Sequence, residues 1–174
     1  MRAIKIYDRN DILEITWDDI KKYHGFGAYM AIGVAYRVVE EGLLELYGDE
    51  IPRREDISIL SGHGGPGFRD VFEFVTRALT RGEYTIDVNY PKAQYDPYRA
   101  QAYAYVFSKK NGESVEVLLK DDFLPPVFYD YLVMDRENSW TEEAYAECQK
   151  LIRILGDRAY NMSREELLIV TRLS

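Results

Sequence analysis

Apolar residues recur at intervals of three and four between positions 28 and 47, as on one face of an amphipathic helix. The residues that keep this spacing are Ile32, Ala35, Val39, Leu43 and Leu46. Ala28 and Ala31, together with Ala35, form a stripe of small side chains that another backbone could approach closely. We therefore expect a long helix over 28–47 that packs closely against a neighbouring element.

Start signals mark several shorter helices. The sequences Thr16–Asp19, Ser139–Glu142 and Ser163–Glu166 have the form of capping boxes, in which two side chains three residues apart accept hydrogen bonds from each other's backbone N–H. Pro66 suits the first position of a helix. We expect helices from 16 to about 22, over 66–79, within 124–139, from 139 to about 155, and a short one after 163.

Alternating patterns predict strands over 56–60 and 83–90 and a hairpin over 99–119, which turns at Asn111–Gly112. On the first hairpin strand aromatic residues face one way and alanines the other, so we expect a helix to lie on the alanine face. Helices followed by an antiparallel meander and more helices predict an α+β fold. Its helices would pack on one mainly antiparallel sheet in a single domain of 174 residues.

Composition narrows the class of protein. A net charge of −8 argues against nucleic acid and against acidic membranes, and no run of about 18 apolar residues could span a bilayer. The start of the chain lacks the apolar run of a signal peptide, so we expect a cytoplasmic protein. Cys148 is the single cysteine, which we interpret as an apolar filler on a helix distant from any site.

Both histidines occupy glycine-rich stretches directly before expected helices, His24 in "YHGFG" and His63 in "SGHGGPG". The N-terminal end of a helix favours anions, and glycines let a ligand touch the backbone. We expect His24 and His63 to share one crevice near Asp70 and to bind a small anionic ligand. Arg69 and the N–H groups of the glycines would assist.

The order of three motifs resembles a known family. His24–Met30 matches an HGHxCPG-like motif that enters a long helix, and Gly67–Glu73 matches a CxxDA(I/V)Q motif that leads a second helix. Ala104–Val117 is similar to an AFTF-like strand followed by a TGK-type turn, and Pro91–Lys92 stands where a glycine–lysine pair is found. These motifs are those of the formylmethanofuran dehydrogenase FmdE family. The resemblance covers about 18–119, and we expect a helical C-terminal extension over 120–174.

The resemblance implies a compact α+β domain, usually dimeric, with a crevice lined by the first two motifs. It also implies an association with one-carbon metabolism and with the molybdenum or tungsten enzymes of methanogenesis. The candidate ligand-binding residues are His24, Gly25, His63, Gly64, Gly65, Gly67, Arg69, Asp70 and Lys92.

This chain departs from the family where the family has thiols. Ala28 and Gly67 stand at the positions of the two motif cysteines, and Phe26 replaces a histidine. We therefore expect no tightly bound zinc or iron, since a soft metal needs thiolate or imidazole ligands. The residues left for a weak metal site are His24, His63 and Asp70.

Three functions fit the sequence. The first is a divergent FmdE-like accessory protein that binds a small molecule or anion. The second is an enzyme in which His24 acts as a general base or a His/Asp set holds a metal. The third is a structural homodimer in which the tyrosine-rich strands face a partner.

Overall fold

The computed structural model describes residues 2–174, and a five-stranded mixed sheet forms its base. The strands are β3 (Ile57–Ser61), β4 (Tyr84–Ile86), β5 (Ala104–Lys109), β6 (Ser114–Leu119) and β7 (Leu168–Leu173). They lie in the order β4-β3-β5-β6-β7, in which β3 and β4 are parallel and all other neighbours antiparallel. The expected α+β class with one mainly antiparallel main sheet is confirmed.

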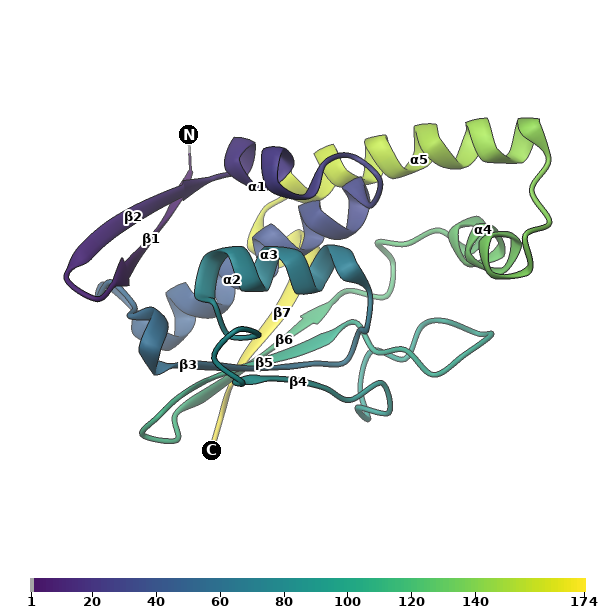
Figure 1. Cartoon of the computed structure of the whole chain (residues 1–174). Coiled ribbons are helices and arrows are strands. Elements are labelled where there is room, and N and C mark those ends of the chain that lie inside the picture. Colours follow the sequence, from purple (N-terminus) through teal and green to yellow (C-terminus); the bar gives the residue numbers. More distant parts are fainter. Residues whose placement is uncertain (1) are drawn as a thin grey trace.

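Helices cover one face of this sheet (Figure 1). They are α1 (Trp17–His24), α2 (Tyr29–Tyr47), α3 (Pro66–Thr76), α4 (Pro126–Glu137), α5 (Glu142–Asn161) and α6 (Arg164–Leu167), with a 3₁₀ turn η1 (Arg54–Asp56) before β3. The long helix, the capping box at Thr16 and the start of α3 at Pro66 agree with the sequence patterns. None of the described helices is long and apolar enough to cross a membrane.

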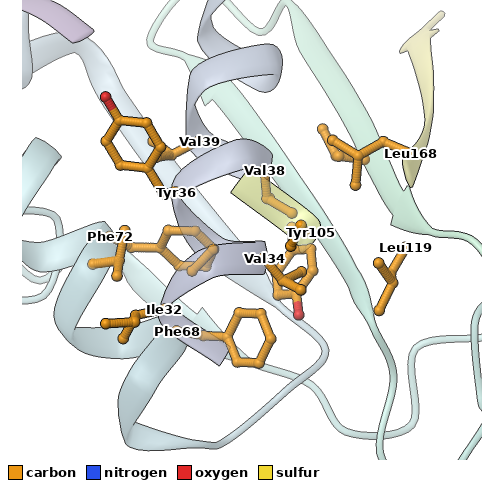
Figure 2. Close-up of a cluster of buried hydrophobic side chains, with 14 of the residues drawn as sticks. Ile32, Val34, Tyr36, Val38, Val39, Phe68, Phe72, Tyr105, Leu119 and Leu168 are labelled. Atoms are coloured by element: carbon orange, nitrogen blue, oxygen red, sulfur yellow. The ribbon is translucent and has the colours of Figure 1, made fainter. Parts of the chain in front are cut away.

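The core lies between the sheet and the helices α2 and α3. Figure 2 shows Phe68 and Phe72 of α3 beside Val34 of α2 and Tyr105 of β5. Phe68 stacks on Tyr105 with ring centroids 5.1 Å apart, and Phe72 meets Phe107 edge-on at 5.7 Å. Complete burial of each such side chain contributes roughly 1.5–3 kcal/mol, so this contact fixes the position of α3 on the sheet.

Helix α2 lies on the aromatic face of β5, and the expectation that a helix would lie on the alanine face is wrong. The small residue that permits the approach is Gly42 on the helix, where an added Cβ would come within 2.7 Å of the Phe107 ring. Ala102, which precedes β5, is buried against Gly62 instead.

Helix α5 crosses α2 at two glycines. A Cβ added to Gly33 would lie 2.6 Å from the backbone oxygen of Gly156, so the two backbones are in direct contact. Thr141 rather than Ser139 caps α5, because its side chain accepts from the N–H of Ala144, and the helix runs to Asn161 rather than to 155.

Two strand segments depart from the sequence expectations. Residues 3–16 form the hairpin of β1 (Ala3–Asp8) and β2 (Asp11–Thr16), in which Ile4 and Ile6 are buried. The idea of a wholly helical extension over 120–174 is also wrong, because α6 has four residues and β7 then pairs with β6 along its whole length. The β-branched residues Ile169, Val170 and Thr171 favour that strand.

Candidate functional site

A cavity of about 420 Å³ lies where the N-terminal ends of α2 and α3 meet α4 and α5. In Figure 1 α5 runs along the top of the molecule and α4 lies beneath its N-terminal end. The cavity is within the size range of small-molecule sites. Its polar or reactive lining residues are His63, Arg99, Tyr103, Tyr131, Asp135, Trp140, Tyr145, Cys148 and Gln149.

One wall comes from the two stretches that resemble the family motifs. Ala28 and Ala31 of the first stretch contact Gly67 of the second, and a Cβ added to Gly67 would lie 3.2 Å from the Ala28 Cβ and 2.8 Å from the Ala31 Cβ. The stripe of small residues on α2 therefore admits a neighbouring backbone, as the sequence predicts. The two positions that match the motif cysteines are adjacent, and both line the cavity.

His63 forms part of the inner surface of the cavity and is 9% exposed. Its Nδ1 accepts a hydrogen bond from the Gly65 N–H at 2.9 Å, and its ring contacts Phe68 and Tyr103. Burial lowers the pKa of His63 to about 3, with a further contribution from the charge of Arg99. The ring is therefore neutral, and Nε2 carries the proton and is a donor.

Arg99 reaches the cavity from the loop between β4 and β5. Its Nε lies 3.5 Å from Oδ2 of Asp96, a carboxylate whose side chain is completely buried. Oδ1 of Asp96 accepts from the Tyr98 N–H at 2.9 Å, and Oδ2 also lies 3.6 Å from Nη1 of Arg136. Asp96 thus orients Arg99. The expectation that this tyrosine-rich loop overhangs a crevice is met at Arg99.

Aromatic side chains from α4, α5 and the turn between them form the opposite wall. Trp140 stacks on Tyr131 with centroids 5.9 Å apart and meets Tyr145 edge-on at 5.6 Å. The Trp140 Nε1–H donates to Asp135 at 3.3 Å. The sequence reasoning missed this wall, although Tyr131, Trp140 and Tyr145 cluster around one predicted helix start.

Cys148 also lines the cavity, so its assignment to a distant helix is wrong. It projects from α5, which returns to the N-terminal end of α2. Burial, helped by Asp135, raises the pKa of the Cys148 thiol to about 11. The thiol is therefore protonated at neutral pH and is a poor nucleophile.

His24 occupies a different place from His63. Its Nδ1 lies 2.8 Å from Oδ2 of Asp70, which links the end of α1 to α3, and neither residue lines the cavity. Arg69 pairs with the same carboxylate at 3.1 Å. The structure thus brings His24, Asp70 and Arg69 together, while His63 lies in the cavity.

The remaining candidates have local roles. Gly25 ends α1 with a φ of 82°, and Gly64 is exposed. Lys92 pairs at 2.7 Å with Glu116 of β6, which is 2% exposed. The N–H of Gly65 is used by His63, so it is not free for an anion.

Between residues 2 and 174 there is no group of three His, Cys, Asp or Glu side chains that could hold a metal ion. The suggested set of His24, His63 and Asp70 is therefore not assembled.

No protein-family model matches the chain, and no curated protein matches it.

Proposed function

We propose that this chain is an FmdE-like protein without motif thiols, and that its cavity binds a small, mainly apolar molecule. The observation that carries the proposal is the meeting of the two motif-like stretches, through Gly27–Ala28 and Gly65–Phe68, at one ligand-sized cavity. A pocket with apolar and aromatic walls and a few convergent polar groups is typical of small-molecule sites.

The contact between Ala28 and Gly67 supports the family resemblance. These positions are 39 apart in the sequence by their numbering, yet their side-chain positions touch, as two thiols of one site would. Alanine and glycine supply no ligand atoms for a soft metal, so the site is proposed to bind an organic molecule. An accessory role beside a molybdenum or tungsten enzyme of one-carbon metabolism is the corresponding physiological proposal.

Binding is favoured over catalysis by the state of the reactive groups in the cavity. The Cys148 thiol has its pKa raised to about 11 and the His63 imidazole has its pKa lowered to about 3, so neither is poised for proton transfer near pH 7. The His24–Asp70 pair has the geometry of an oriented general base and carries catalysis as a second candidate function.

A dimer built on the tyrosine-rich strands has less support. Tyr103 and Tyr105 are 1% and 0% exposed, so they belong to the core of one chain and cannot form its surface.

A fluorescence titration with N-phenyl-1-naphthylamine, a neutral aromatic probe, tests the binding function. We expect saturable binding of one probe per chain. In Gln149→Phe a ring added on α5 fills part of the cavity, and we expect at least about tenfold weaker binding, since overlap with bound ligand costs more than about 1.4 kcal/mol.

Lys150→Phe is the matched control, because Lys150 is exposed on the same helix and does not line the cavity. Circular dichroism checks that both variants are folded. Equal affinity of the probe for both variants, or no saturable binding to the wild type, would contradict the proposal.

A further inference from the structure

The polar groups of the cavity are unevenly distributed. Arg99 and Asp135 are its two charged lining residues in the described part of the chain. His63 lies near Arg99, whose charge contributes to the lowered pKa of the ring. Asp135 lies on the α4 side, where it accepts from Trp140. The cavity therefore has a donor end at His63 and Arg99 and an aromatic body toward α4 and α5.

His63 presents a donor without a protein partner. Its Nδ1 is occupied by the Gly65 N–H, while Nε2 makes no hydrogen bond to any residue from 2 to 174. Nε2 is also absent from the sealed polar atoms of that range, so it is open to the cavity. A polar atom of a nine-tenths buried ring, turned into an apolar cavity, has a hydrogen bond to gain from a ligand acceptor.

Arg99 supplies a charged donor beside it. Asp96 holds the guanidinium through Nε, and the terminal amino groups of Arg99 make no hydrogen bond within residues 2–174. The buried carboxylate of Asp96 fixes the direction of the side chain. An arginine fixed in this way presents two parallel N–H donors, which match the two oxygens of a carboxylate.

We propose that Arg99 and His63 bind the carboxylate of a planar, mainly apolar monocarboxylic acid, whose body lies against the aromatic side chains of the cavity. The inference rests on the proposed function and adds the chemical class of the ligand.

A single negative charge fits this cavity better than a dianion. Arg99 is the one cationic side chain among the described lining residues, and Asp135 would repel a second negative group. A phosphate dianion generally needs more than one cation or several free N–H groups, and the Gly65 N–H is already used.

Displacement of bound N-phenyl-1-naphthylamine by two matched competitors tests the inference. 2-Naphthoate and 2-naphthamide have the same ring system, and one carries a carboxylate where the other has a neutral amide. We expect 2-naphthoate to compete about tenfold or more better, as a charge-assisted hydrogen bond contributes on the order of 1.5–3 kcal/mol.

The ratio of the two competition constants is the readout. In Arg99→Gln we expect it to fall close to one. His63→Asn, which keeps an acceptor for the Gly65 N–H and removes the Nε2 donor, should lower it several-fold and serves if Arg99→Gln does not fold. Arg69→Gln is the control, because its side chain is 44% exposed like that of Arg99 but does not line the cavity.

Equal competition by the acid and the amide in the wild type would overturn the inference and leave the binding function intact. A ratio that survives both Arg99→Gln and His63→Asn would overturn it as well. Absence of probe binding would instead contradict the proposed function itself.

Discussion

Burial, helped by the charge of Arg99, lowers the pKa of His63 from 6.5 to about 3. Above pH 6.5 the imidazole is neutral in both the folded and the unfolded chain, so its titration does not affect stability. As the pH falls from 6.5 toward 3, the unfolded chain binds a proton at this residue and the folded chain does not. The free energy of unfolding therefore decreases across this window.

His63→Asn removes this source of pH dependence. Between pH 7 and pH 5 we expect the wild type to lose about 2 kcal/mol more stability than the variant, from roughly 1.4 kcal/mol per pKa unit. Urea unfolding at the two pH values measures the difference, and the comparison cancels all groups common to both proteins. An identical loss in both proteins would mean that His63 is accessible to protons in the folded state.

The sequence singles out some of the residues that form the cavity and misses others. His63 and Gly67 are recognisable because glycine-rich stretches before helices are unusual. The side of the molecule to which a histidine turns depends on the neighbouring helices, so the separation of His24 from His63 could not be predicted. Cys148 and Trp140 carry no local signal, since their place depends on how α5 returns to α2.

At the level of elements, the crossing of α2 and α5 is set by two glycines. Each lies against the backbone of the other helix or of its neighbouring residue: a Cβ on Gly156 would meet the Tyr29 oxygen at 2.6 Å. Arg37 of α2 strengthens the contact, because it is buried and donates to the carbonyl oxygens of Ala159 and Met162 at the end of α5. These carbonyls would otherwise lack intrahelical partners.

Gly33→Ala is expected to destabilise the protein by about 2 kcal/mol or more, because the added methyl meets backbone atoms that cannot move aside. Gly27→Ala is the control, since an added Cβ there has nothing within 4 Å, and it should change stability by less than about 1 kcal/mol. Thermal unfolding of both variants measures this. A Gly33→Ala protein as stable as the control would mean that α5 is not held against α2 as described.

Elements with strong local signals could be predicted and elements defined by pairing could not. The long α2, the capping boxes at Thr16 and Ser163, and the turn at Asn111–Gly112 all rest on neighbouring residues. The β1–β2 hairpin was missed although Ile4 and Ile6 alternate with polar residues, because charged residues flank its turn. β7 was missed because its start follows a genuine capping box at Ser163.

For the whole molecule, the two ends of the described chain contribute to one core. α5 packs on α2, β7 completes the sheet beside β6, and Leu167 and Leu168 are buried. The stretch from 120 onward is therefore part of the domain and supplies much of the cavity wall.

A chain ending at Leu119 is expected to lack a cooperative unfolding transition, because it would expose the face of α2 that α5 covers and leave β6 as an open edge. Circular dichroism during urea titration measures this, with the full chain as the reference. A sharp transition in the shortened protein would show that 120–174 is an appended unit after all.

The contact between Gly33 and Gly156 joins positions about 120 apart in the sequence. Such distant contacts form late in folding, because a long stretch of chain must be ordered before its ends meet. Until α5 docks, the part of α2 around Gly33 is open to other unfolded chains, which favours association between them. We therefore expect refolding to be slow and its yield to fall as protein concentration rises, whereas a local unit such as the β1–β2 hairpin forms early.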